Sequence, residues 1–299
     1  MERAVSIPRL HLVDGTYELF RAHFSKRPSH ASPTGQPLKA TLGLASSMIA
    51  LAHDPDEAMT HIAVAFDNPI RSFRNDLFDG YKTEEGVEAE LLAQFDLAEE
   101  TTRALGMVTW RMDKWEADDA LATAAVRFAG DFDQVRILTP DKDLGQVLRG
   151  QHIVQVDRVR QKLIDEPKLL ETRGIAPGSV ADWLALVGDT ADGIPGVPGF
   201  GEKTAAALLR AYEHLEAIPL TGDWSVPVRG LPRLQEALRT RMTDALLYKK
   251  LATLVTDVPL AESIDDLAFR GVPREAFAAW SAKVGAREGL EGRITRWAP

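Results

Sequence analysis

The chain has 299 residues, 45% of them hydrophobic, so it is long enough to bury one large core or two ordinary ones. It contains no cysteine, which excludes disulfides and thiolate metal sites and suits a reducing compartment. No apolar run approaches ~20 residues and no signal-like segment opens the chain, so we expect a cytoplasmic protein without membrane contact. The net charge of −9 does not by itself favour a polyanionic partner.

Three short apolar runs each end at or close to an aspartate: residues 10–13 before Asp14, 62–66 before Asp67, and 136–138 before Asp141. Helical patterns separate these runs, at 38–52, 90–105 and 116–129. This alternation predicts an α/β unit with a mostly parallel sheet. Because ligands gather at the carboxyl ends of parallel strands, we expect the three aspartates to lie close together.

The pattern changes after about residue 175, where helices alternate with loops rich in glycine and proline. The expected helices are 177–187, 202–213, 231–241, 243–254 and 273–284. We therefore predict two domains, an α/β domain over 1–175 and a helical domain over 176–299.

Acidic residues recur at the expected strand ends and helix starts. The candidates for a metal site are Asp14, Asp67, Glu116, Asp118, Asp119, Asp141, Asp143, Asp189 and Asp192. Each alone is equally typical of a turn or a helix cap. Together they form a ligand set of oxygens only, which suits Mg²⁺ or Mn²⁺ and disfavours zinc. Two such cations in one cleft can drive hydrolysis of a phosphodiester, so the pattern indicates a metal-dependent nuclease.

A glycine-rich turn follows the last two of these aspartates. Gly196, Gly199 and Gly201 lead directly into a helix that begins near Glu202. Glycine lets a backbone approach a partner closely, and the amides at a helix N-terminus attract phosphate. The turn alone is also typical of a simple helix–helix connection. Its position beside Asp189 and Asp192 favours contact with a nucleic-acid backbone.

In their order along the chain, these motifs resemble the bacterial and phage 5′-3′ exonucleases and flap endonucleases, which include the 5′-nuclease domain of DNA polymerase I. The matching motifs are Val-Ala-Phe-Asp67, Ser72-Phe-Arg74, Gly80-Tyr81-Lys82, Glu116-Ala-Asp-Asp119, Ile137-Leu-Thr-Pro-Asp141-Lys-Asp143 and the run from Gly188 to Thr204. The resemblance implies a PIN-like nuclease core joined to a helix–three-turn–helix (helix-hairpin-helix) DNA-binding module. It also implies that the nine acids form a site for two Mg²⁺ or Mn²⁺ ions.

The resemblance extends to residues that would contact DNA. It implies that Lys82 approaches the scissile phosphate, that Tyr81 meets the terminal base and that Arg74 belongs to the catalytic set. The residues implied to grip duplex phosphates are Gly196, Val197, Gly199, Phe200, Gly201, Glu202, Lys203 and Thr204, with K⁺ in the turn. The implied partner is DNA with 5′ flaps, nicks or 5′ ends, and we expect a monomer.

The chain departs from the family pattern in two places. Residues 83–90, where the family has a partly basic arch rich in proline, carry Glu84, Glu85, Glu88 and Glu90 and no proline. Gly193 stands where the family usually has asparagine. A structure-specific DNA-binding protein with weak or lost nuclease activity is therefore the alternative, and a PIN-type ribonuclease is a third hypothesis.

Overall fold

The computed structural model describes residues 8–286 and 289–299. Its centre is a six-stranded sheet with strand order β3-β2-β1-β4-β5-β6. The strands are β1 (Arg9–Asp14), β2 (His61–Asp67), β3 (Val108–Met112), β4 (Gln134–Leu138), β5 (Ile153–Asp157) and β6 (Lys162–Ile164). All neighbours pair in parallel except β6, which is antiparallel to β5. Of the three strands expected from the sequence, all are present and lie side by side at the middle of the sheet.

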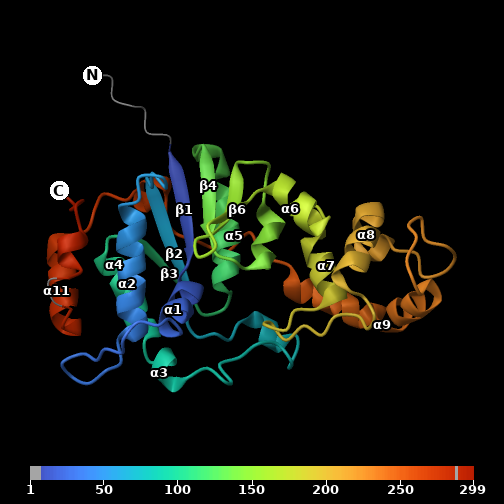
Figure 1. The fold of residues 1–299 in the computed structure, drawn as a ribbon, viewed down its shortest axis with the longest axis horizontal. Helices are drawn as coiled ribbons and strands as arrows, with labels where there is room; N and C mark the ends of the chain where they lie inside the picture. Colours follow the sequence, from blue (N-terminus) through green and yellow to red (C-terminus); the bar gives the residue numbers. More distant parts are fainter. Residues whose placement is uncertain (1–7, 287–288) are drawn as a thin grey trace.

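Helices cover both faces of this sheet (Figure 1). They are α1 (Gly15–His23), α2 (Lys39–Ala52), α4 (Phe95–Ala104) and α5 (Ala117–Phe128), while α3 (Ala89–Leu92) precedes α4 and α6 (Glu166–Arg173) follows β6. The helix expected over 90–105 is broken, since residues 93–94 separate α3 from α4. Neither α1 nor α6 was predicted from the sequence.

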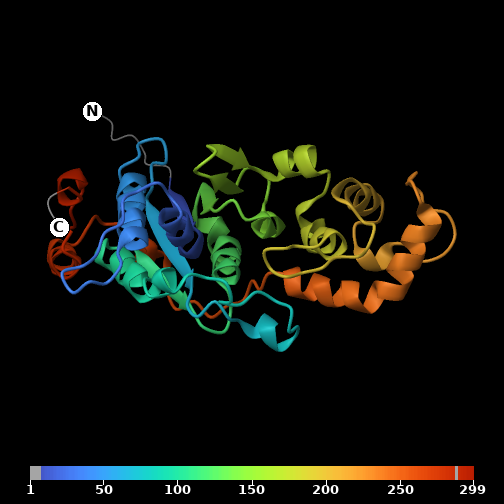
Figure 2. The ribbon, with the colours of Figure 1, turned by 60° about the horizontal axis from the view of Figure 1, so that its bottom comes forward.

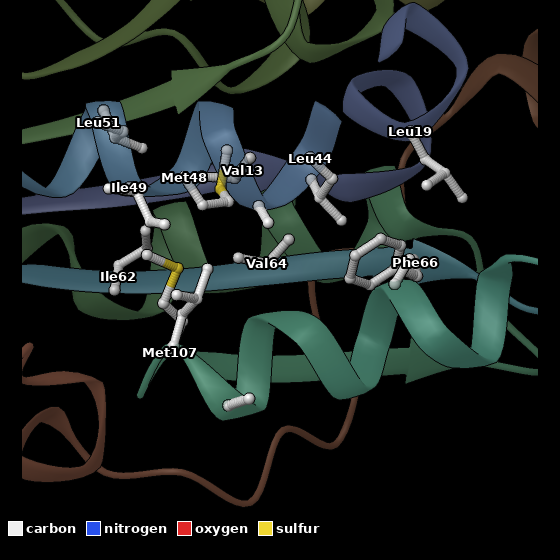
Figure 3. Close-up of a cluster of buried hydrophobic side chains, with 14 of the residues drawn as sticks. Val13, Leu19, Leu44, Met48, Ile49, Leu51, Ile62, Val64, Phe66 and Met107 are labelled. Atoms are coloured by element: carbon white, nitrogen blue, oxygen red, sulfur yellow. The ribbon is translucent and has the colours of Figure 1, made fainter. Parts of the chain in front are cut away.

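Alternation along the strands divides the core into two layers. Val13, Val64 and Phe66 face α1, α2 and α4, as Figure 3 shows for Val64 and Phe66 below Leu44 and Met48 of α2. Their neighbours in the strands, such as Leu12 and Ala65, face α5. Both layers are almost fully buried, which fixes the register and hence the position of each strand's last residue.

A helical lobe follows the sheet and has its own core, built around Trp183, Leu208 and Leu238. It contains α7 (Val180–Val187), α8 (Glu202–Tyr212) and α9 (Leu231–Ala252). Figures 1 and 2 show this lobe beside the α/β lobe. The sequence predicted two helices, 231–241 and 243–254, where the structure has one, because Leu238, Ala245 and Tyr248 continue a single buried stripe.

The last part of the chain returns to the α/β lobe. α10 (Ile264–Leu267) contacts β2, and α11 (Arg274–Val284) contacts α4. Phe269 and Trp280 are buried in the same core as Val64. The segment expected to form one helical domain over 176–299 is therefore shared between two cores. No helix in the described ranges has the length and apolar character needed to cross a membrane.

Candidate active site

A cleft of about 730 Å³ lies at the carboxyl ends of the central strands. Six aspartates line it: Asp14 at the end of β1, Asp67 at the end of β2, Asp118 in the first turn of α5, Asp141 after β4, and Asp189 and Asp192 between α7 and α8. The structure thus brings together acids that lie up to 178 residues apart in the sequence. The parallel sheet gathers Asp14, Asp67 and Asp141, because its strand ends share one edge, and the packing of the loop between α7 and α8 adds Asp189 and Asp192.

Three carboxylates at one side of the site have the spacing that a cation requires. Oxygens of Asp143, Asp189 and Asp192 all lie within 4.8 Å of one another, and all three residues are buried. Oδ1 of Asp143 is buried without a hydrogen-bond partner among the described residues. A buried acceptor of this kind is costly unless something positive binds it. These residues fit a divalent cation.

The carboxylates on the other side of the cleft interact electrostatically. Burial, reinforced by the charges of Asp67 and Asp141, raises the pKa of Asp14 to about 7. Burial also raises the pKa of Asp67 and Asp118, and for Asp118 the charges of Asp141 and Asp14 add to the effect. So many like charges at close range favour the neutral acids unless cations compensate them. A cation would relieve this repulsion, although among the described residues only Asp143, Asp189 and Asp192 have ligand oxygens within 4.8 Å of one another.

Lys82 is the cation that reaches into the acidic cluster. Its Nζ lies 2.8 Å from Oε2 of Glu116 and 2.9 Å from Oδ1 of Asp192, and its side chain is 24% exposed at the cleft. Burial opposes the charge on Lys82, yet Glu116 and Asp192 raise its pKa well above the usual value. Burial likewise opposes ionisation of Glu116, but Lys82 and Arg74 lower its pKa to about 2. Both groups are therefore charged throughout the neutral range.

Arg74 and Asp119 lie beneath this cluster and do not line the cleft. Arg74 is 1% exposed and donates from Nη1 and Nη2 to the two oxygens of Asp119, both at 2.7 Å. The backbone amides of Glu116 and Val255 donate to the same carboxylate. The structure therefore places Asp119, expected among the metal ligands, where its oxygens hold Arg74 and the start of α5.

Tyr81 is also buried, at 4% exposure, and packs in the core of the helical lobe. Its hydroxyl donates to Oε2 of Glu116 at 3.2 Å, and burial raises its pKa. Its ring is not among the cleft-lining groups that the structure describes. In this conformation Tyr81 supports Glu116 from behind.

The loop between α7 and α8 packs directly against the segment that carries Lys82. The amide of Lys82 donates to the carbonyl of Asp192 at 3.1 Å. Gly193 has φ +74°, and a Cβ there would lie 2.1 Å from the carbonyl oxygen of Gly80. The glycine that stands here in place of the family's usual asparagine therefore lies in close contact with the backbone of Gly80. The contact fixes Asp192 relative to Lys82.

The rest of the loop presents its backbone and not its apolar side chains. Val197 and Phe200 are buried in the helical lobe. Glycine at 201 precedes α8, and the first hydrogen bond of this helix runs from the amide of Ala205 to the carbonyl of Gly201. The amides of residues 202–204 thus have no partner within the helix. Because Glu202 and Lys203 are exposed, this helix end is open to an anion.

Sequence reasoning missed two cations of the cleft. Nζ of Lys142 lies 2.5 Å from Oδ2 of Asp189. Arg173, at the end of α6, also lines the cleft, and its Nη1 is buried without a hydrogen-bond partner among the described residues. Lys142 lies between two of the predicted acids in the Asp-Lys-Asp motif, so the sequence could have identified it as a residue of the site. Arg173 has no local signal, because only the fold brings α6 to the cleft.

Two family profiles match this chain. Residues 9–174 match the profile of the 5′-3′ exonuclease N-terminal resolvase-like domain, and residues 175–275 match the 5′-3′ exonuclease C-terminal SAM fold. The chain therefore belongs to the 5′-3′ exonuclease family. This confirms the family and the fold class predicted from the sequence.

Relatives include a protein named 5′-3′ exonuclease from Bacillus subtilis (strain 168), which is 33% identical over 269 residues, covering 87% of this chain and 88% of the relative. DNA polymerase I of Bacillus caldotenax is 34% identical over 289 residues, which are 95% of this chain but 32% of the polymerase. The chain thus spans about a third of the polymerase relatives that it matches.

Solved structures share the fold at low sequence identity. T5 5′-exonuclease, in a structure described as having divalent metal ions (zinc) bound, superposes with a TM-score of 0.65 at 18% identity over 92% of this chain and 98% of its own. Human GEN1 in complex with Holliday junction DNA gives 0.58 at 13% identity, over 94% and 70%. These comparisons establish the architecture.

Proposed function

We propose that this protein is a metal-dependent 5′-3′ exonuclease and structure-specific (flap) endonuclease. It hydrolyses DNA phosphodiesters near 5′ ends or at junctions between single strand and duplex. The cleft with its six aspartates and Lys82 carries this proposal. The names of the relatives support it, and so do the structural neighbours solved with divalent metal ions or with DNA.

We propose two divalent cations, Mg²⁺ or Mn²⁺, in this cleft. Asp143, Asp189 and Asp192 would hold one, and the group of Asp14, Asp67, Asp118 and Asp141 would hold the other. When bound, such cations activate a water molecule and stabilise the leaving oxygen of a phosphodiester. Their charge would also lower the raised pKa values of the buried aspartates, so the carboxylates would be ionised at neutral pH.

The remaining charged groups orient the substrate. Lys82 supplies a fixed positive charge at the cleft wall, where it would pair with a phosphate oxygen. Glu116 holds the ammonium group of Lys82 in place, and Arg74 with Asp119 holds Glu116. Among the predicted catalytic residues, Lys82 is thus proposed to contact substrate, while Arg74 and Tyr81 act as positioning residues in this conformation.

The helical lobe would hold the duplex. We propose that the amides at the start of α8, with Lys203, bind backbone phosphates, and that K⁺ occupies the turn from Gly196 to Gly201. In this division most of the catalytic cleft belongs to residues 1–175, while residues 176–299 add Asp189 and Asp192 and carry most of the DNA contacts. We further propose that the protein acts as a monomer in the cytoplasm.

One observation favours the alternative, a structure-specific DNA-binding protein with weak nuclease activity. The acidic arch segment, residues 83–90, borders the cleft through Glu85, and Glu88 is held by His23 at 3.0 Å. A single strand passing this segment would meet like charge. The effect is about 1 kcal/mol or less for each exposed carboxylate at physiological salt.

The test is digestion of 5′-labelled flap, nicked and RNA-primed duplexes with and without Mg²⁺. We expect Mg²⁺-dependent release of short 5′ products from the DNA substrates, loss of cleavage in Lys82→Ala, and unchanged cleavage in Lys283→Ala. Lys283 is the matched control, because it is exposed and pairs with Glu100 away from the cleft. A gel shift without cleavage in every condition would favour the binding protein. Cleavage of the RNA strand alone would favour a ribonuclease.

A further inference from the structure

A second cavity, of about 420 Å³, lies outside the cleft and is strongly basic. We call it the basic pocket. Its cationic lining residues are Arg21, Arg27, Arg136, Arg158, Lys162 and Arg293. Asp54 and Glu57 are its acidic lining residues. This excess of positive charge contrasts with the acidic cleft and with the net charge of the whole chain.

The fold assembles this pocket from distant segments. Its lining comes from the end of α1, the middle and end of α2, the strands β4 to β6 and the C-terminal part of the chain. Helix α1 separates it from the cleft, since Tyr17 and Phe20 line the cleft and Arg21 lines the pocket. In Figure 1, α1 and α2 lie beside β1, and the β4–β6 end of the sheet continues beyond them.

Four guanidinium groups converge on two adjacent serines of α2. Arg27 and Arg293 donate to Oγ of Ser46, at 3.4 and 2.6 Å. Two others donate to Oγ of Ser47: Arg21 and Arg158, both at 2.9 Å. A hydroxyl oxygen is a neutral acceptor, so these bonds orient the arginines without cancelling their charge.

Two carboxylates partly compensate the arginines of the pocket: Glu18, which lies beneath them, and Glu57, whose Oε2 lies 2.9 Å from Nε of Arg136. Glu18 has a side chain 2% exposed and pairs with both Arg21 and Arg158. Each guanidinium carries five N–H donors in a planar fork, so several donors stay available for a ligand with many acceptor oxygens.

We propose that the basic pocket binds a phosphate group at a site separate from the catalytic cleft. Converging guanidinium forks match the oxygens of phosphate in geometry and charge. The favoured source is a backbone phosphate of a DNA arm that leaves the cleft past α1. A free phosphoryl ligand would satisfy the same donors.

The test compares two charge-matched double variants. R27A/R293A removes the two exposed arginines that bond to Ser46 and leaves the pairs of buried Glu18 intact. R270A/K283A removes two exposed cations that do not line the cleft or the pocket. Binding is measured with EDTA present, by anisotropy with a nicked duplex and with the same DNA lacking the upstream strand. Inorganic phosphate binding is measured by ³¹P line broadening.

We expect R27A/R293A to weaken binding of the nicked duplex about tenfold and to lower the slope of log affinity against log salt by roughly 1 to 2. Binding of the shortened DNA should not change, and R270A/K283A should behave as the unaltered protein. Loss of phosphate binding with unchanged DNA binding would support the site and assign it to a free ligand. Equal losses in both variants, or no loss with any probe, would overturn the proposal. The DNA comparison rests on the proposed function, whereas the phosphate measurement does not. Neither experiment measures cleavage, so a failure of this proposal can be told apart from a failure of the proposed function.

Discussion

Asp119 and Asp141 carry the same side chain in the same acidic site, but the structure assigns them opposite effects on stability. We consider the variants Asp119→Asn and Asp141→Asn. Asp119 is 0% exposed and binds both terminal nitrogens of Arg74, which is itself buried. Asp141 lies at the cleft, where one oxygen accepts from the amide of Asp143 at 2.9 Å and the neighbouring carboxylates are like charges.

Breaking a buried ion pair by removing one partner costs about 3–5 kcal/mol. Glu116 remains 3.1 Å from Nη1 of Arg74, so we place Asp119→Asn near the lower limit, at about 3 kcal/mol. At roughly 2–4 °C for each kcal/mol, the melting temperature should fall by on the order of 10 °C. Asp141→Asn keeps an acceptor and removes one repulsive charge, so its stability should be unchanged or higher by about 1 kcal/mol.

The assay is urea or thermal unfolding in EDTA, combined with calorimetric Mg²⁺ binding to the folded variants. We expect Asp119→Asn to be destabilised and to retain much of its Mg²⁺ affinity at a temperature where it is folded. Asp141→Asn should be stable and lose Mg²⁺ affinity. If Asp119→Asn kept its stability within about 1 kcal/mol and lost Mg²⁺ as completely as Asp141→Asn, Asp119 would be a ligand and this reasoning would be wrong.

Three further predictions concern pH, the arch and the loop. In EDTA, the free energy of unfolding should fall as the pH rises from about 4 to about 7. Burial raises the pKa of Asp14 in the folded protein to about 7, so ionisation of Asp14 over this range disfavours the folded state. Asp14 alone should account for a fall of up to roughly 4 kcal/mol. Mg²⁺ should remove this fall, and urea titrations that show stability rising with pH in EDTA would contradict the prediction. Glu85→Gln removes a negative charge at the cleft, so it should strengthen binding of a 5′-flap substrate a few-fold at low salt, by about 1 kcal/mol or less, and by less at high salt. Binding is measured by anisotropy. Equal affinities of the variant and the unaltered protein at low salt would show that the arch does not face the single strand. Gly193→Asn should lower the melting temperature and kcat together, because the new Cβ would collide with the carbonyl of Gly80. An unchanged melting temperature would show that the loop between α7 and α8 relaxes to accept the side chain.

The central strands and the convergence of the acids could be predicted from the sequence. β1, β2 and β4 are short apolar runs with buried neighbours, and an aspartate follows each within a few residues. The edge strands β3 and β6 lacked this signal, whereas β5, whose five residues are all buried and end at Asp157, carried it and was not predicted. β3 alternates exposed Arg111 with buried Trp110, and β6 has three residues with exposed or half-buried side chains. Their pairing comes from tertiary contacts, which a local pattern does not contain.

For a similar reason, the sequence alone could not predict which acids face the cleft and which hold other side chains in place. Asp118 and Asp119 are adjacent, yet one faces the cleft and the other faces Arg74, 45 residues away in the chain. The rotation of α5 about its axis decides this, and the packing of α5 on the sheet sets that rotation. The position of Arg173 at the cleft likewise depends on how α6 is placed after β6.

The return of the chain to the α/β lobe makes the helical lobe an insertion. The polypeptide enters it near Gly174 and leaves it near Thr253, where Arg74 bonds to the carbonyls of Leu251 and Thr253. Two chain connections, the hydrogen bonds of Arg74 and the packing of the loop between α7 and α8 against residues 80–82 thus hold the lobe in place. Any movement of that lobe on DNA would pull on Arg74, and through it on Glu116 and Lys82.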